Sequence, residues 1–268
     1  MRITLNSDTT FYVDSLNGSD LTGDGLTRLT AFKTPQHARD TVYKTYDCNL
    51  YSVTFFYVNS GVPYGGVIAA YPLLGLGHDY GESYRGELDA NGSIAVLVQD
   101  NIAGCFHLAG GAQAYIYNMG MSSTNGVPCV VAAYQGLAAL NRVVLYSAQN
   151  APLINAGPSC GRIDILNEWW VINAGIAGNA LLNATDRSYI TVPVEAPCTL
   201  YGSPIFTFST AAVTNYSIID CRCAFNGGAR GRRWATAANG MFITGHNLDT
   251  YLPGDLVGNS LDGTGTRL

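Results

Sequence analysis

Short apolar runs recur along the later part of the chain at a nearly constant spacing. From about residue 104, apolar positions mark successive copies that lie 24, 24, 28 and 24 residues apart. These positions are Phe106, Val130, Ile154, Leu182 and Phe206. A repeat of this length is typical of a solenoid, in which each coil buries its apolar face only against neighbouring coils.

Each copy divides into two half-patterns. The first half-pattern occupies 105–111, 129–136, 152–158, 180–186 and 204–210. The second occupies 114–124, 137–148, 162–175, 188–202 and 215–227. Two or three short strands per copy, without a helical pattern between them, predict a parallel β-helix whose corners are marked by Gly, Asn and Asp.

The one convincing amphipathic helix is predicted over 35–46. Pro35 suits a first helical turn, Thr34 can act as the N-cap, and Ala38, Val42 and Tyr46 recur on one face. Beyond residue 50 the pattern changes to strand-like runs at 52–58, 67–74 and 93–100. A solenoid needs caps over its exposed ends, and this helix is placed where an N-terminal cap is expected.

These patterns divide the chain into three parts. Residues 1–50 form the lead-in and capping helix, 51–245 the parallel β-helix, and 246–268 the C-terminal closing segment.

The stretch 11–34, FYVDSLNGSDLTGDGLTRLTAFKT, combines an apolar strand with a loop rich in Gly, Asn and Asp. Its acids do not follow the alternating ligand spacing of an EF-hand, because the twelfth position counted from Asp14 is Gly25. The loop precedes the repeats, and its acids suit turn-making. We therefore interpret it as the lead-in to the cap. The residues predicted to close the first coil are Phe11, Val13, Leu26 and Phe32.

Composition limits the classes of partner. Charged residues make up 12% of the chain, with 31 glycines, 20 asparagines and only two lysines beside 12 arginines. A net charge of −5 gives no general attraction to nucleic acid. No window approaches the roughly 18 apolar residues of a membrane span, and the N-terminus lacks the apolar region of a signal peptide. Seven cysteines without a C-x-x-C pair predict buried thiols and neither a disulfide framework nor a zinc site.

Both ends of the sequence resemble a known family. FYVDSLNGSDLTGDGLTRLTAFKTPQHA (11–38) is similar to the opening of pectate-lyase-like right-handed β-helix proteins. TYLPGDLVGNSLDGTGTRL (250–268) resembles the closing segment of phage tail-spike and prophage β-helix proteins. The resemblance implies an all-β fold, a right-handed single-stranded parallel β-helix with one N-terminal capping helix.

The same resemblance implies a function. Such proteins are virion-associated spikes or fibres, usually homotrimers that contact other virion proteins and host surface glycans. The expected role is attachment to host cell-surface polysaccharide, by a protein made in bacterial cytoplasm and carried on the virion. Two alternatives stay open: a polysaccharide depolymerase, hydrolase or lyase, on the same fold, and a structural adaptor within the virion.

The strongest cluster for glycan recognition is DILNEWW (164–170). In an unbroken strand Asp164, Glu168 and Trp170 share one face, and Trp169 lies on the other. Sugars present C–H patches beside hydroxyls, so indoles flanked by carboxylates suit them. The candidate carbohydrate-binding residues are Trp169, Trp170, Glu168 and Asp164; the alternative is that the tryptophans are buried in a trimer interface.

Catalysis would need a pair of acids. Glycoside hydrolysis uses two carboxylates about 5–9.5 Å apart, a separation that same-face strand neighbours reach. The catalytic candidates are Asp164, Glu168, Glu87 and Asp89. Lyase chemistry needs a base beside an acid, for which Arg162 next to Asp164 is the nearest candidate.

One basic run and four scattered histidines remain. The run 229–240 carries Arg230, Arg232, Arg233 and Trp234, predicted to lie in a loop that contacts either an anionic group or a neighbouring subunit. The histidines, which lack metal-ligand spacing, are His37, His78, His107 and His246. No metal and no cofactor is therefore expected.

Overall fold

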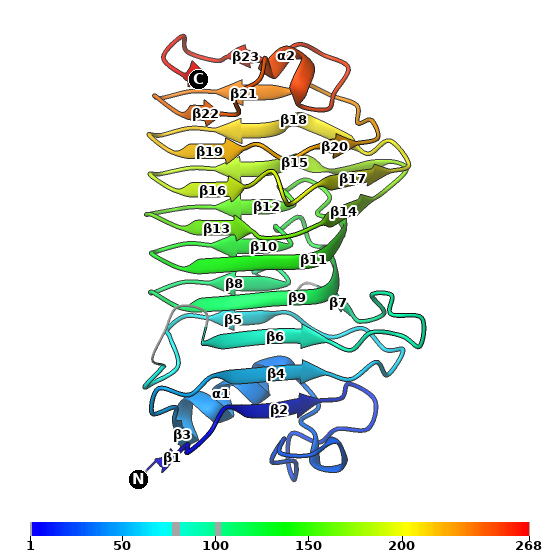
Figure 1. Cartoon of the computed structure of the whole chain (residues 1–268), viewed down its shortest axis with the longest axis vertical. Coiled ribbons are helices and arrows are strands. Elements are labelled where there is room, and N and C mark those ends of the chain that lie inside the picture. Colours follow the sequence, from blue (N-terminus) through cyan, green and yellow to red (C-terminus); the bar gives the residue numbers. More distant parts are fainter. Residues whose placement is uncertain (1, 77–80, 100–102, 268) are drawn as a thin grey trace.

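The chain is a right-handed parallel β-helix of about seven turns, as the repeat and the family resemblance predicted (Figure 1). The computed structural model describes residues 2–76, 81–99 and 103–267. The coils stack from the N-terminal end to the C-terminal end, and neighbouring strands are parallel throughout the two large sheets. His78 and Asp100, the last residue of the predicted run 93–100, lie outside the described residues.

One face of the solenoid is an eight-stranded sheet. From the N-terminal end its strands are β5 (Val67–Ala69), β8 (Phe106–Leu108), β10 (Val130–Ala132), β12 (Ile154–Ala156), β15 (Ile176–Ala184), β18 (Ile205–Val213), β21 (Trp234–Thr236) and β23 (Asn259–Ser260).

A fourteen-stranded sheet forms the other two faces. Its main path is β2 (Thr9–Val13), β4 (Val53–Tyr57), β6 (Glu82–Gly86), β9 (Gln113–Ser122), β11 (Leu137–Ser147), β13 (Arg162–Ile165), β16 (Tyr189–Val192), β19 (Ile218–Cys221), β22 (Met241–Ile243) and β24 (Thr266–Arg267). The branch strands are β7 (Leu97–Gln99), β14 (Trp169–Ile172), β17 (Cys198–Tyr201) and β20 (Phe225–Asn226).

The fourteen-stranded sheet turns a corner in the middle of β9 and β11. Asn118 and Arg142 occupy that corner with φ of 57° and 51°, a left-handed conformation that redirects the strand. The first halves of β9 and β11 pair along the main path, and their second halves pair with β7 and β14. The strands expected in each second half-pattern are therefore confirmed.

Backbone pairing confirms four of the five anchor positions. Phe106, Val130, Ile154 and Leu182 occupy one register column. The fifth position was wrong, because Leu182 pairs with Ala211 and not with Phe206. Irregularities between β15 and β18 place Phe206 opposite Gly178. Phe206 is buried as well, so an apolar pattern cannot tell the two positions apart.

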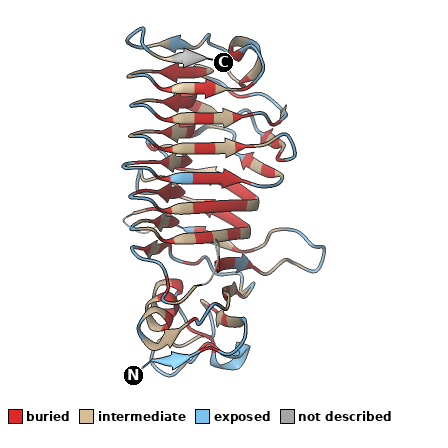
Figure 2. Cartoon of the chain, turned by 60° about the vertical axis from the view of Figure 1, so that its left-hand side comes forward, coloured by how far each residue is buried: buried red, intermediate tan, exposed pale blue. Residues whose placement is uncertain are grey.

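The core runs along the inside of the coils, where the strands show buried positions from end to end (Figure 2). Inward side chains stack in register, and the rings of Phe55 and Tyr84 lie 5.2 Å apart between centroids. One such column contains Phe11, Phe55, Tyr84, Ile116, Leu140 and Ile165. Close packing of like residues on successive coils gives the solenoid its continuous apolar interior.

The predicted helix is α1 (Pro35–Thr45), and it caps the N-terminal end. The Thr34 hydroxyl accepts the backbone N–H of His37 as the N-cap. Gln36 Oε1 accepts from Ile68 N at 2.7 Å, and Gln36 Nε2 donates to Ile68 O at 3.2 Å. Its amide thus satisfies the free edge of β5 as a neighbouring strand would.

The acidic lead-in loop makes turns. Asp14 accepts from Leu16 N, and Asp20 accepts from Lys33 N at 2.8 Å. The loop contains the 3-10 helix η1 (Arg28–Thr30). The short strands β1 (Ile3–Thr4) and β3 (Tyr46–Asp47) pair with each other.

The first coil is closed as predicted by Phe11, Val13 and Phe32, which are buried. The prediction for Leu26 was wrong, since it is 47% exposed. Gly25, at φ 73°, lies against the Phe32 ring, and the chain turns there so that Leu26 faces outward.

The C-terminal end is closed by α2 (Leu248–Tyr251) with β23 and β24. Leu248 and Leu252 are buried there, and Trp234 Nε1 donates to Asp249 Oδ1 at 2.9 Å. The three-part division at residues 50 and 245 stays a prediction.

Candidate functional site

An aromatic groove of about 360 Å³ lies on the outside of the solenoid, over β11, β14 and β17. Its wall carries the rings of Tyr146, Trp170 and Tyr201, and residues 92–94 border it. Arg142 supplies the charged side of the groove. Aromatic lining with a few polar groups is the usual make-up of a ligand site.

Strand register brings these side chains together. Val144 pairs with Trp170, which pairs with Thr199, and Ile172 pairs with Tyr201. Alternating residues of parallel strands point to the same face, so two adjacent columns of outward side chains form the wall. Aligning copies of the second half-pattern in this register is the signal that would have found the groove from the sequence.

The Tyr146 ring lies against the backbone of β9. A side chain at Gly120 would place its Cβ 2.9 Å from Tyr146 Cε2. The absence of that side chain leaves room for the ring to lie along the wall. Burial raises the pKa of Tyr146, so the phenol stays neutral and keeps its hydrogen-bond donor at neutral pH.

Arg142 and Glu168 form an ion pair at the groove. Arg142 Nε lies 3.6 Å from Glu168 Oε1, which is beyond hydrogen-bond distance. Nε is buried and has no hydrogen-bond partner among the described residues. Both side chains are more than one third exposed, so the pair is weakly held and its groups can reorganise around a polar ligand.

The predicted cluster 164–170 does not form one strand. It divides into the end of β13 and the start of β14, with 166–168 between them. The prediction that Trp169 binds carbohydrate does not fit its position, because its ring is fully buried and its Nε1 donates to Ala196 O at 3.1 Å. No face of that indole is open to a sugar. Asp164 is nearly buried on β13 and pairs with Arg162 at 3.0 Å. Of the four predicted residues, Trp170 lines the groove, and Glu168 pairs with the lining residue Arg142.

Glu87 and Asp89 follow the end of β6 and are engaged in loop structure. The Glu87 carboxylate pairs with Arg28 and accepts from Asn59 N at 2.9 Å. Burial raises the pKa of Glu87, but the Arg28 guanidinium and Asn59 N–H outweigh it, so this pKa lies below its ordinary value. Asp89 accepts from the backbone N–H groups of Asn91 and Ser93 at 2.9 and 2.8 Å. Its lowered pKa makes Glu87 a poor proton donor at neutral pH.

The basic run lies at the C-terminal end. It is not a plain loop, since Trp234 begins β21 and Arg230 and Arg232 form single bridges with β18 and the closing segment. Arg232 Nη1 donates to Asn259 Oδ1 at 3.0 Å, and Arg233 N donates to Leu256 O at 3.0 Å. Trp234 is only 6% exposed, so its ring packs inside and is not open to a ligand or a neighbouring subunit.

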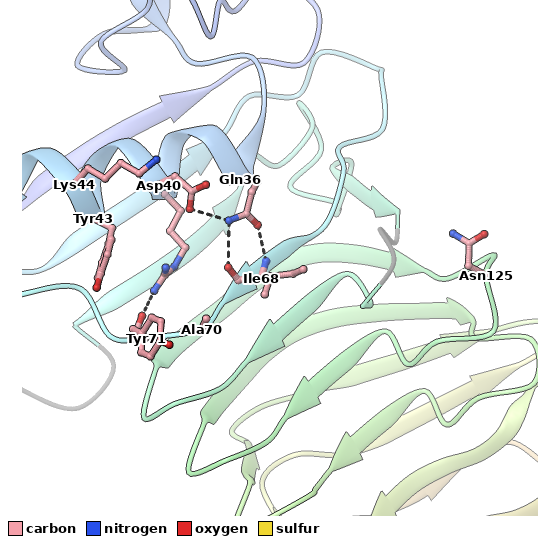
Figure 3. Close-up of a pocket in the computed structure, with 9 residues that line it drawn as sticks. Gln36, Asp40, Tyr43, Lys44, Ile68, Ala70, Tyr71 and Asn125 are labelled. Atoms are coloured by element: carbon pink, nitrogen blue, oxygen red, sulfur yellow. Dashed lines mark hydrogen bonds between the residues drawn. The ribbon is translucent and has the colours of Figure 1, made fainter.

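A larger hollow of about 700 Å³, which sequence reasoning missed, lies between α1 and β5 (Figure 3). Arg39 is one of the residues that line it and pairs with buried Glu82 at 2.8 Å. The Gln36 side chain is hydrogen-bonded to the backbone of Ile68 (Figure 3). These polar groups thus hold the cap in place, and Lys44 stands at the border of the hollow. The i, i+3, i+4 spacing of the second face of the helix is the only sequence signal for it.

Within the described residues, no group of three or more His, Cys, Asp or Glu side chains is arranged to hold a metal ion. No helix in the same part of the chain is long and apolar enough to cross a membrane.

Comparison with known proteins adds no relative. No protein-family model matches the sequence, and neither a curated protein nor a solved structure matches it. The fold thus rests on the chain's own structure, and function has to be argued from the aromatic groove.

Proposed function

We propose that this chain is a spike or fibre protein of a bacteriophage or phage-like particle that attaches to host cell-surface polysaccharide. The observation that carries the proposal is the aromatic groove, where Tyr146, Trp170 and Tyr201 line an open hollow beside the Arg142–Glu168 pair. Flat rings match the C–H faces of sugars, and the neighbouring charged groups match their hydroxyls. The resemblance of 11–38 and 250–268 to tail-spike β-helix proteins supports the same role.

The proposal includes the setting of the protein. We place it on the virion as a homotrimer in contact with other virion proteins, in line with the family that its two ends resemble. A purely structural adaptor would have no use for an open aromatic groove, so glycan binding separates these two roles.

Binding is favoured over cleavage. Asp164 is paired with Arg162, Glu87 with Arg28 and Glu168 with Arg142, and Asp89 closes a turn. A depolymerase needs one carboxylate free to attack or to take a proton, and another that stays protonated. Of the four acids only Glu168 is loosely held, and the residues that line the groove include no second carboxylate to act with it.

Fluorescence provides a direct binding assay. Trp169 and Trp234 are buried, so a change in tryptophan emission on adding purified capsular polysaccharide or lipopolysaccharide reports Trp170. Trp170→Ala and Tyr201→Ala, assayed by calorimetry, are expected to weaken binding by about tenfold or more, as for other central aromatic contacts. Phe208→Ala is the matched control, because Phe208 is a 41% exposed ring on the other sheet.

Three outcomes would count against the proposal. If both groove variants bind glycan as tightly as the wild type, the groove is not the recognition site. If the wild type binds no glycan at all, the structural adaptor is favoured. New reducing ends or new double bonds, lost in Glu168→Ala or Glu87→Ala, would make the protein a depolymerase.

A further inference from the structure

A row of outward side chains crosses the first face of the fourteen-stranded sheet, around the corner from the aromatic groove. Register aligns Tyr12, Phe56, Arg85, Tyr117 and Asn141 on successive coils. We call these five residues the outer row. Their strand neighbours, including Phe55, Tyr84 and Ile116, are buried, so alternation turns the outer row toward solvent. Four steps of about 4.8 Å give it a length of about 19 Å.

Arg85 is held between aromatic rings within the outer row. Its Cζ lies 5.7 Å from the centroid of Phe56 and 5.5 Å from that of Tyr117. The row continues beyond it, with Tyr12 and Phe56 5.6 Å apart between centroids. Contact with two rings restricts the long side chain, so a ligand meets a guanidinium that has already lost much of its conformational freedom.

Within residues 2–76, 81–99 and 103–267, no carboxylate forms an ion pair with Arg85. Among the described residues five arginines form ion pairs, and Arg85 is in none of these pairs. The acid closest to it in sequence, Glu87, is taken by Arg28 and by the backbone N–H of Asn59. Arg85 is exposed, so its planar fork of donors can receive a carboxylate, sulfate or phosphate.

The outer row also leads toward the groove. Asn141 ends the row and is followed by Arg142, which lines the groove. Tyr115 lies beside the row, with its ring 4.9 Å from that of Tyr117. An extended chain of sugars can therefore stack along the row and pass the corner into the groove.

We propose that the outer row recognises an acidic polysaccharide, with Arg85 binding the anionic substituent and Tyr117 packing against a sugar ring, while Phe56 lies under both Arg28 and Arg85 and holds the cation in place. This inference rests on the proposed glycan-binding function and adds the class of glycan. The net charge of −5 gives no general attraction to polyanions, so selection for acid depends on this local cation. The length of the row favours a polymer over a free anion.

The test uses charged and neutral forms of the same backbone. Dextran sulfate is compared with dextran, and polygalacturonate with its carboxyl-reduced form, by calorimetry on the full chain. We expect tighter binding of the charged member of at least one pair, and the responding pair identifies sulfate or carboxylate as the anion. Arg85→Gln is expected to lower the affinity for that charged polymer about tenfold, since a charge-assisted hydrogen bond is lost. The affinity for the neutral polymer should not change.

Two further variants complete the design. Arg187→Gln removes the same charge from an exposed site on another coil and is expected to change neither affinity. Tyr117→Ala is expected to weaken the binding of both polymers, because it removes a stacking surface. The charged polymer should lose more affinity than the neutral one, because Arg85 also loses one of the two rings that restrict it. Circular dichroism and the melting temperature of each variant check that the fold is kept.

The results separate this inference from the proposed function. If the wild type binds glycans but Arg85→Gln keeps both affinities, the acidic specificity is overturned and glycan binding stands. If Arg85→Gln alters the oligomeric state in sedimentation, the outer row is a contact between copies, and the inference is overturned. If the wild type binds none of the four polymers or any purified surface glycan, both proposals are overturned.

Discussion

The buried ion pair between Arg39 and Glu82 is predicted to hold the capping helix to the solenoid. The Arg39 side chain is 4% exposed and the Glu82 side chain 0%. Arg39 donates to Glu82 through Nε at 2.8 Å and Nη2 at 3.2 Å, and Tyr84 also donates to Glu82 through its hydroxyl. Burial alone would lower the pKa of Arg39, but the Glu82 carboxylate outweighs it, so the pKa lies above its ordinary value.

Arg39→Met removes one member of this pair and leaves a buried carboxylate whose one side-chain partner among the described residues is the Tyr84 hydroxyl. Breaking a buried ion pair from one side costs about 3–5 kcal/mol, and the loss of two charge-assisted hydrogen bonds gives a similar figure. Removing both charges in Arg39→Met/Glu82→Leu should restore much of the stability, because no unpaired charge then stays buried.

Urea unfolding followed by far-UV circular dichroism measures these free energies. Coils of a solenoid contact only their neighbours. The loss of stability should therefore appear as faster hydrogen exchange in α1, β4 and β6. Arg222→Met is the matched control, since Arg222 pairs with Asp220 while its own side chain is 58% exposed, and little change in stability is expected. A loss below about 1 kcal/mol for Arg39→Met, or a double variant no more stable than the single one, would refute the reasoning.

Three further predictions concern other parts of the chain. Because the folded pKa of Glu87 lies below its ordinary value of 4.5, its ion pair stabilises the fold above that pH and the contribution is lost on acidification. The lower melting temperature of Glu87→Gln at neutral pH should therefore merge with that of the wild type as the pH falls well below 4.5. Gly136→Ala would place a Cβ 2.1 Å from Leu108 O and should cost about 1–3 kcal/mol in urea unfolding. Gly65→Ala is the control and should cause no such loss, because nothing lies within 4 Å of the added Cβ. Equal losses of stability in the two variants would contradict the packing argument. Of the seven free thiols only Cys160 is exposed, so Ellman's reagent should titrate one thiol in the native protein and seven in denaturant; two or more fast native thiols would contradict the burial.

Trp169 and Trp170 mark the limit of prediction for the candidate site. Strict alternation puts adjacent residues on opposite faces, and Trp169 does point inward while Trp170 points to the groove. Which of the two faces inward depends on the break at 166–168, which the composition of DILNEWW does not reveal. The same break separates Asp164 from Glu168 and removes the expected common face.

The sequence by itself determined the solenoid, its two half-patterns per coil and the N-terminal helix. These features are set by local periodicity and by Gly, Asn and Asp corners, which depend only on residues close along the chain. The tertiary structure alone decided which residues meet on the outside. Successive members of the outer row lie 44, 29, 32 and 24 residues apart, so no period in the sequence reveals them. Loops of different length join the coils, and only the hydrogen-bond register between strands aligns Arg85 with the rings on either side.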